Sequence, residues 1–430
     1  MAEALARAAY ALLLRLATPV YLLRLWWRGR REAGYRRHIG ERLGFFDGAP
    51  VPGRLWLHAV SLGETRAAVP LIDELRRQRP ALQLLLTHGT ATGREAGRAL
   101  LREGDAQAWL PYDTPGAVRR FLRTHRPLGG VVMETEVWPN LMAAAQAAQL
   151  PMLLANARLS ERSRRKGERL RALMHPALAR FTQVLAQTEG DAQRLRDSGA
   201  CAVQVLGNLK FDMTPKPELL ARGKGWRAAL GRPVVMAAAT REGEEGPLLR
   251  AFADRIAGLP HPQPLLLLVP RHPQRFDEVA VGIAAAGFAL ARRGSWQHMP
   301  GEDALRADVW LGDSLGEMPL YYACADVALL GGSFAPLGGQ NLIEAAACGC
   351  PLVMGPHTFN FADAAELAIA AGAAERVDGI EAGVTRALAL ARESGQPAHA
   401  RRVQQALAFA SEHRGAADRM ARAVLARVFG

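Results

Sequence analysis

The chain has 430 residues, 49% of them hydrophobic, and a formal net charge of +13 at pH 7. This length is too great for a single core and predicts two domains of about 200 residues each. The charge would favour nucleic acid as a partner, but almost every cation is an arginine and no basic stretch is interleaved with aromatic residues, so we expect no nucleic-acid binding. The four cysteines show neither a C-x-x-C pair nor a zinc spacing, which argues against disulfides and a structural metal.

The first predicted element is the apolar segment from Ala4 to Leu25, which contains three arginines. It falls short of the roughly 20 uncharged residues that a membrane span needs. Trp26, Trp27 and a cluster of basic residues follow it, namely Arg28, Arg30, Arg31, Arg36, Arg37 and Arg42. We therefore expect residues 1–30 to form an interfacial helix or a marginal anchor held by anionic lipid. The alternative is an ordinary amphipathic helix packed on the first domain, and the lack of a small-residue cleavage site argues against a removable signal peptide.

From Leu55 onward, short apolar runs alternate with longer amphipathic segments, a pattern typical of parallel sheets with crossover helices. The runs are nearly continuous in apolar character, which predicts strands covered on both faces. The first sheet is predicted to contain Leu55–Val60, Leu82–Thr87, Gly130–Glu134, Met152–Asn156 and Val184–Gln187. The second is predicted to contain Val234–Ala239, Leu265–Pro270, Val309–Gly312, Val327–Gly331 and Leu352–Met354.

The segment Gly207–Asp212 and the turn Pro215–Pro217 carry loop residues between the two series. We expect one α/β domain at 31–206 and a second at 207–430, both doubly wound, with the closing helices of 381–430 able to cross back onto the first. Ligands of such sheets bind beyond the carboxyl ends of the strands, so the facing loops would form an interdomain cleft.

Two strand-to-helix junctions carry glycines beside ionisable residues. Ser61–Thr65 follows the first apolar run, and Gly331–Glu344 follows a late one. Glycine allows close backbone approach to a ligand, and a helix N-terminus attracts an anion. Each junction alone is equally well explained as a structural turn, so the combination carries the argument.

Six segments, in chain order, carry a more specific signal: His58–Glu64, Met133–Asn140, Gly207–Asp212, Pro270–Pro273, Gly312–Met318 and Gly355–Phe361. Together they resemble the Kdo transferases of lipopolysaccharide assembly, which move 3-deoxy-D-manno-octulosonic acid (Kdo) from CMP-Kdo to lipid A. The resemblance implies a GT-B architecture, two Rossmann-like domains of which the first holds the acceptor and the second the CMP-sugar.

The resemblance also implies roles for individual residues. Glu64 matches the general base of an inverting transfer, although a glutamate at a helix start is commonly only a cap. Glu344 would accept from ribose hydroxyls and Ser333 would donate to phosphate, while Asn341 is equally well read as a helix cap. The expected donor-binding residues of the second domain are Asn208, Lys210, Pro270, Arg271, His272, Leu315, Gly316, Glu317, Ser333, Asn341, Leu342, Ile343 and Glu344.

Lys210, one of only four lysines, stands beside Asn208 near the domain junction, where it would meet the Kdo carboxylate or the phosphate, or form an interdomain salt bridge. Ser61, Gly63, Glu134 and Glu136 are candidates on the acceptor side. In an extended segment Glu134 and Glu136 would point to opposite sides, so we expect only one to face the site and reject a glycosidase carboxylate pair.

The chain has no Asp-x-Asp motif of the kind that holds a divalent ion on a diphosphate. A CMP donor has one phosphate, so we expect catalysis without metal or other cofactor. The expected partners are CMP-Kdo, a lipid A precursor such as lipid IVA, and the cytoplasmic face of the bacterial inner membrane. The alternatives are a GT-B sugar-nucleotide epimerase, a transferase for another nucleotide sugar, and a non-catalytic membrane scaffold. One, two or more Kdo transfers would use the same residues.

Overall fold

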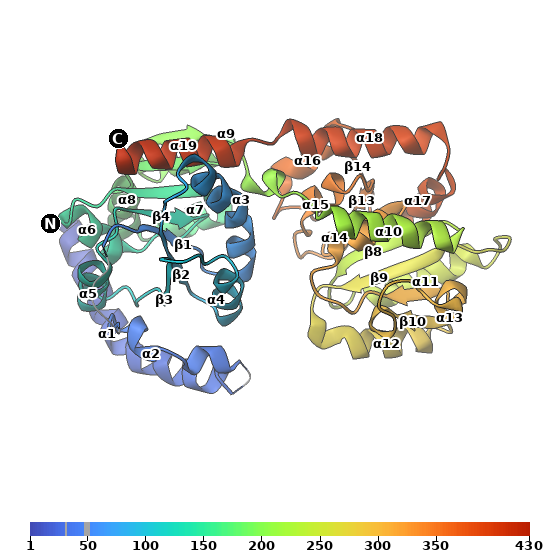
Figure 1. Ribbon diagram of the computed structural model, residues 1–430, viewed down its shortest axis with the longest axis horizontal. Coiled ribbons are helices and arrows are strands. Elements are labelled where there is room, and N and C mark those ends of the chain that lie inside the picture. Colours follow the sequence, from blue (N-terminus) through green and yellow to red (C-terminus); the bar gives the residue numbers. More distant parts are fainter. Residues whose placement is uncertain (31, 47–51) are drawn as a thin grey trace. The chain divides into compact units, whose positions relative to one another are not determined.

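The computed structural model describes residues 1–30, 32–46 and 52–430 (Figure 1). Arg31, part of the expected basic cluster, lies outside them. The chain divides into two compact units. Unit 1 contains Met1–Met213 and Arg414–Gly430, and unit 2 contains Thr214–His413.

Unit 1 is built on a parallel sheet of seven strands in the order β3-β2-β1-β4-β5-β6-β7. The strands are β1 (Leu55–His58), β2 (Leu84–His88), β3 (Ala106–Trp109), β4 (Gly129–Met133), β5 (Met152–Ala157), β6 (Gln183–Ala186) and β7 (Val203–Val205). The order reverses between β1 and β4, which is the doubly wound arrangement.

Helices cover both faces of this sheet (Figure 1). They are α1 (Ala2–Arg28), η1 (Ala33–Arg36), α2 (Ile39–Arg42), α3 (Leu62–Gln78), α4 (Ala91–Arg98), α5 (Pro115–His125), α6 (Pro139–Ala147), α7 (Glu161–Glu168), α8 (Arg171–Ala179), α9 (Glu189–Asp197), η2 (Leu209–Asp212) and α19 (Ala416–Phe429). Successive strand residues alternate between two cores, as Leu55 and Leu57 pack into one and Trp56 into the other. The expectation of strands covered on both faces is confirmed.

Unit 2 contains a second parallel sheet of seven strands, in the order β10-β11-β9-β8-β12-β13-β14. The strands are β8 (Val234–Thr240), β9 (Leu265–Pro270), β10 (Leu290–Arg292), β11 (Val309–Leu311), β12 (Val327–Leu330), β13 (Leu352–Met354) and β14 (Ala374–Arg376). The helices are α10 (Pro217–Leu230), α11 (Glu245–Ile256), η3 (Pro273–Arg275), α12 (Phe276–Ala285), η4 (Arg293–Ser295), α13 (Glu302–Arg306), α14 (Met318–Cys324), α15 (Leu342–Ala347), α16 (Ala362–Ala370), α17 (Ile380–Arg392) and α18 (Pro397–Glu412). The predicted fold of two doubly wound units is confirmed.

The division between the units falls after Met213 rather than after residue 206. The reason is that η2 packs on α3 and α19 of unit 1. The Asp212 carboxylate accepts hydrogen bonds from the N–H groups of Gly415 and Ala417, at 2.6 and 2.7 Å. This carboxylate caps the N-terminus of α19, so the closing helix belongs to unit 1 although α18 belongs to unit 2.

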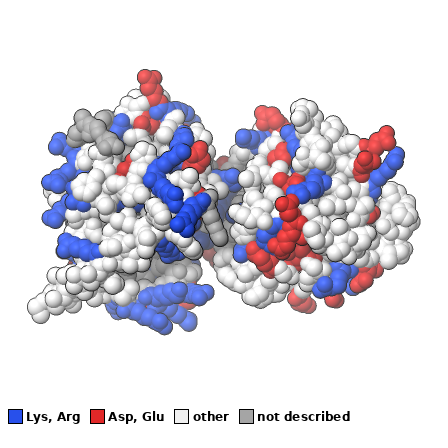
Figure 2. Space-filling model, turned by 90° about the horizontal axis from the view of Figure 1, so that it is seen from below, with Lys and Arg blue, Asp and Glu red and all other residues white. Residues whose placement is uncertain are grey.

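Helix α1 packs against α8 and α6 along one side. Arg180 donates a hydrogen bond to Glu3, and the Tyr10 hydroxyl is hydrogen-bonded to the buried Asp113. The other side exposes large apolar residues, namely Leu5, Leu12, Leu13, Leu16, Val20, Leu23, Trp26 and Trp27. Among the described residues, α1 alone is long and apolar enough to cross a membrane by length and composition. The visible face of unit 1 is also rich in Lys and Arg side chains (Figure 2).

Candidate functional site

Each sheet has a switch point, where the strand order reverses and where doubly wound proteins place their ligands. In unit 1 it lies between β1, which leads into Ser61 and Glu64, and β4, which leads into Glu134. In unit 2 it lies between β8, which leads into Arg241, and β12, which leads into Gly331. The structure thus places the two junctions singled out from the sequence at the two switch points.

Glu64 is the third residue of α3 and forms a capping box with Ser61. Its Oε2 accepts the Val60 N–H at 2.5 Å and the Ser61 N–H at 3.4 Å, and Ser61 Oγ accepts the Glu64 N–H at 3.4 Å. Gly63 lies exposed on the first turn. The capping role weighed for Glu64 is therefore real, but it occupies one oxygen. Among the described residues none donates a hydrogen bond to Oε1, which is left to take a proton.

The electrostatic surroundings of Glu64 are unusual for a helix cap. Partial burial raises the pKa of its carboxyl, and the nearby carboxylates of Glu134 and Glu136 raise it further. Hydrogen bonds from Val60 and Ser61 oppose the shift, and the resulting pKa is about 7. A carboxyl with this pKa is well matched to general base catalysis near neutral pH.

Glu134 and Glu136 differ from the extended alternation expected for them. Glu134 has a left-handed backbone with φ of 58°, and residues 134 and 135 form a turn at the end of β4. Because the turn breaks the period of two, both carboxylates act on Glu64 rather than one. Glu134 is 8% exposed and pairs with Arg158 at 3.3 Å, while burial raises the pKa of Glu136. A non-glycine residue in this conformation is strained, as is common at functional sites.

Lys210 joins the same group from η2. Burial lowers the pKa of its ammonium and Arg158 lowers it further, whereas Glu134 and Glu64 oppose the shift. Its position is fixed locally, because Asn208 Oδ1 accepts the Lys210 N–H at 3.0 Å. Asn156, fully buried at the end of β5, accepts the Leu209 N–H at 3.1 Å. Asn208 therefore acts as a local cap of η2. Lys210 is the residue of the two that interacts with the carboxylates of Glu134 and Glu64.

In unit 2, Pro270 ends β9 and is buried, while Arg271 is exposed beyond it. The Arg271 N–H donates to the Thr240 carbonyl at 2.9 Å, which ties β9 to the end of β8. His272 follows, and partial burial and then Arg241 lower its pKa. Arg271 is an exposed guanidinium at the carboxyl edge of the sheet, the geometry that suits a phosphate.

The glycine turn after β12 is held by contacts within unit 2. A Cβ on Gly331 would lie 2.4 Å from the Ala239 carbonyl oxygen, so glycine alone fits between the ends of β12 and β8. The Gly332 N–H donates to both carboxylate oxygens of Glu244, at 2.9 and 2.8 Å. The Ser333 hydroxyl, fully buried, donates to the Leu330 carbonyl and accepts the Gly355 N–H. Ser333 thus stabilises the turn from inside. Its buried hydroxyl does not reach the surface, so the expected hydrogen bond from this hydroxyl to a phosphate is not supported.

The four residues Asn341 to Glu344 begin α15. Asn341 caps α15 by accepting the Ile343 N–H at 3.2 Å, as in the second of the two roles considered from the sequence. Leu342 and Ile343 are 0% and 1% exposed, so their side chains belong to the core. Glu344 is partly exposed at the end of the first turn and remains the member of this group whose side chain can meet a ligand.

The remaining residues expected to bind the CMP-sugar form the turn before α14. Leu315 is 75% exposed, and Gly316 has φ of +81° with open space around it. Glu317 is committed to an internal network with Arg293, Arg222 and Ser314. Burial alone would raise the pKa of Glu317, but the Ser314 hydroxyl and the guanidinium groups lower it. Leu315 and Gly316 are therefore the accessible part of this turn.

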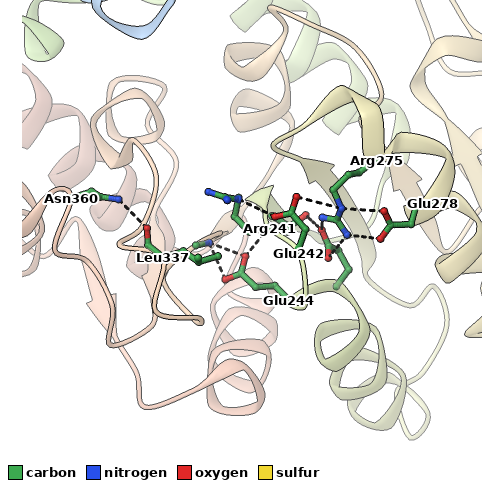
Figure 3. A network of polar contacts seen from close by, with 10 residues as sticks. Arg241, Glu242, Glu244, Arg275, Glu278, Leu337 and Asn360 are labelled. Atoms are coloured by element: carbon green, nitrogen blue, oxygen red, sulfur yellow. Dashed lines mark hydrogen bonds and ion pairs between the residues drawn. The ribbon is translucent and has the colours of Figure 1, made fainter. Parts of the chain in front are cut away.

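Glu244 is the principal site residue that the sequence reasoning missed. Besides Gly332 it accepts the Arg241 N–H at 2.9 Å, and its neighbours Glu242 and Arg275 form a chain of ion pairs that continues to Glu278 (Figure 3). The signal was present, since residues 240–246 form a third strand-to-helix junction with a glycine. No group of three or more His, Cys, Asp or Glu suited to a metal ion occurs in the described ranges.

Comparison with known proteins places this chain among a set of named relatives. The family model described as 3-deoxy-D-manno-octulosonic-acid transferase (kdotransferase) matches residues 37–213. A 3-deoxy-D-manno-octulosonic acid transferase of Bordetella pertussis is 49% identical over 427 residues, 96% of this chain and 97% of its own. The transferase of the same description from Haemophilus influenzae is 35% identical over 361 residues, 83% of either chain. The crystal structure of a glycosyltransferase from Rickettsia africae ESF-5 shares the fold, with a TM-score of 0.59, 12% identity and coverage of 88% of this chain and 98% of its own.

Proposed function

Because the chain belongs to the family of 3-deoxy-D-manno-octulosonic acid transferases, which are glycosyltransferases, we propose that it moves Kdo from CMP-Kdo to a lipid A precursor with Glu64 as the general base. The observation that carries the proposal is the partly buried Glu64 at the switch point of unit 1, with a pKa raised to about 7 and one carboxylate oxygen to which no residue of the described ranges donates.

The proposed reaction is a single displacement. An acceptor hydroxyl loses its proton to Glu64 Oε1 as its oxygen bonds to the anomeric carbon of Kdo. The bond between that carbon and the phosphate oxygen breaks on the opposite side, and CMP leaves with the electron pair. A single base and a cradle for the departing phosphate suffice for such an inverting transfer.

The neighbours of Glu64 supply the rest of the first half-site. Glu134 and Glu136 keep the pKa of the base near neutrality, and Arg158 balances the charge of Glu134. Lys210, whose ammonium interacts with Glu134 and Glu64, would bind the carboxylate of Kdo or the departing phosphate. Ser61 and Gly63, on the first turn of α3, would contact the acceptor sugar.

For the donor half-site we propose Arg271 on the phosphate, His272 beside it and Glu344 on ribose hydroxyls. Leu315 and Gly316 would contact the nucleotide through an accessible turn. Pro270, Ser333, Asn341, Leu342, Ile343 and Glu317 would shape this half-site from within. The single phosphate of the donor needs no bridging cation, so we propose transfer without a metal or another cofactor.

We place the protein on the cytoplasmic face of the bacterial inner membrane, where an acylated acceptor stays. The exposed apolar side of α1 and the tryptophans at its end support this location. The acceptor would then reach unit 1 without leaving the lipid, as required of an enzyme that adds Kdo to lipid IVA in inner-core synthesis.

The test is mass spectrometry of a tetra-acylated, diphosphorylated lipid A precursor incubated with the purified protein and CMP-Kdo in the presence of a chelator. We expect mass increments of one or more Kdo residues, which also count the transfers. A parallel reaction with another CMP-linked sugar should leave the lipid unchanged. An unmodified lipid with CMP-Kdo would contradict the proposal, and an increment from a different nucleotide sugar would reassign the donor.

A further inference from the structure

A basic stripe runs along α7. Arg162, Lys166 and Arg169 are spaced four and three residues apart, so they lie on one face of the helix, and all three are exposed. The other cations of this segment are paired, since Arg164 and Arg165 share Glu161, and Arg171 pairs with Glu168. None of the ion pairs formed within the described ranges involves Arg162, Lys166 or Arg169.

The stripe begins near the edge of the sheet that carries Glu64. Helix α7 follows β5, whose carboxyl end neighbours that of β4. Arg158, which begins the connection, pairs with Glu134 of the catalytic group. The four residues from Arg158 to Arg162 span at most about 14 Å. The first cation of the stripe therefore lies within about 14 Å of backbone of Arg158, the residue that pairs with Glu134 beside the base.

The connection to α7 is fixed rather than loose. The Leu159 N–H donates to Asp191 at 2.9 Å, and the Arg194 side chain donates to the Leu159 carbonyl. Ser160 caps α7 by accepting the Ser163 N–H at 3.2 Å. These contacts hold the stripe at the edge without occupying its cations.

The surroundings of the stripe are amphiphilic. Leu170, directly after Arg169, is 58% exposed. Helix α7 packs against α8, and α8 packs against α1, the helix that carries exposed apolar residues on its other side (Figure 1). Unpaired cations beside exposed apolar side chains suit a ligand that carries a phosphate on a lipid.

We propose that Arg162, Lys166 and Arg169 bind a phosphate group of the acceptor glycolipid and so position its sugar at Glu64. The inference rests on the proposed function and adds a determinant of acceptor specificity to it. Guanidinium and ammonium groups form charge-assisted hydrogen bonds with phosphate oxygens, and three of them converging from one face select an anionic headgroup over a neutral one.

The test compares a triple variant, Arg162→Gln with Lys166→Gln and Arg169→Gln, with the unaltered protein in neutral detergent, where no anionic bilayer is present. The matched control changes Arg119, Arg123 and Arg126 to Gln, because these exposed arginines of α5 and its C-cap have the same spacing and belong to the helix that precedes β4 rather than to the one that follows β5. The substrates are CMP-Kdo and the acceptor with its phosphates or after phosphatase treatment, and thermal unfolding checks that each variant is folded.

We expect the KM for the phosphorylated acceptor to rise at least about tenfold in the stripe variant, with the KM for CMP-Kdo unchanged. The dephosphorylated acceptor should be used equally by all three proteins. Equal KM values for the phosphorylated acceptor, or an equal rise for the dephosphorylated one, would overturn the inference and leave Kdo transfer standing. A defect seen only on vesicles of anionic lipid would assign the stripe to the bilayer surface and also overturn it. Absence of transfer by the unaltered protein would instead sink the proposed function and the inference with it.

Discussion

Glu64 and Glu134 follow the neighbouring strands β1 and β4 at the switch point of unit 1, and the charge of Glu134 raises the pKa of Glu64. Glu134 has a left-handed backbone, with φ of 58°, in the turn that follows β4. Burial and the neighbouring negative charge raise the pKa of Glu64 to about 7, and this raised pKa distinguishes Glu64 from an ordinary helix-capping glutamate.

The first prediction concerns pH. Glu64 must be ionised to accept a proton, so kcat/KM should rise with pH through about 7. Removing the Glu134 charge with Glu134→Gln lowers the pKa of Glu64, so the rising limb should move to lower pH. The control, Glu95→Gln on the exposed surface of α4, should leave the profile in place. A profile that is flat from pH 6 to 8 would rule out this assignment of the base.

Lys210→Met should weaken the donor complex. Loss of a charge-assisted contact worth about 1.5–3 kcal/mol would raise the KM for CMP-Kdo about 10- to 150-fold and change the KM for acceptor little. Lys216→Met, which removes an exposed lysine nearby, should behave as the unaltered protein. Steady-state kinetics with each substrate varied separately decide the matter, and an effect confined to the acceptor would move Lys210 to the acceptor side.

Glu244→Ala should loosen the glycine turn of unit 2. The substitution leaves the buried Gly332 N–H without its acceptor, at a cost of about 1–3 kcal/mol. Amide exchange across residues 331–344 should accelerate and CMP should bind more weakly. Glu242→Ala, at an exposed position, should leave amide exchange unchanged and should alter the free energy of CMP binding by no more than about 0.5 kcal/mol. Unaltered exchange in Glu244→Ala would show that another contact holds the turn.

Two exposed leucines of α1, Leu12 and Leu16, lie one turn apart and are 57% and 68% exposed. Burying a leucine contributes about 1.5–3 kcal/mol, so Leu12→Gln with Leu16→Gln should lower partitioning onto lipid vesicles at least about tenfold. Val281→Gln in unit 2, which removes an equally exposed apolar residue, serves as the control for cosedimentation. Equal binding of both variants would mean that α1 is not the lipid contact.

The sequence predicted the interior of the fold better than its margins. All ten predicted strands are present, and the four that were missed, β3, β7, β10 and β14, are the outer strands of the two sheets. Interior strands must be apolar on both faces and so appear as continuous runs. The outer ones are short and partly exposed, as in the Ala374–Arg376 strand, and their sequences carry no such run.

The candidate site shows a similar limit. Glu64 and Arg271 could be proposed from the sequence because they follow predicted strands within segments that resemble the family, and Lys210 because lysine is rare in this chain. The buried roles of Ser333 and Glu317, and the carboxylate of Glu244 on Gly332, depend on contacts between segments far apart in the chain. The joint action of Glu134 and Glu136 could not be predicted either, since it depends on one left-handed residue at the end of β4.

The central claim is that Glu64 is the base, and the most direct test measures kcat and stability of Glu64→Gln together. We expect kcat to fall about 10²- to 10⁴-fold. The pKa of Glu64 is higher in the folded protein than its ordinary 4.5, so the carboxyl costs stability increasingly as the pH rises from about 4.5, and the cost is complete above about 7. At pH 8 the variant should therefore be as stable as the unaltered protein or more stable, by up to about 3 kcal/mol, with the difference vanishing near pH 4.5. A folded variant that retains full kcat would contradict the account.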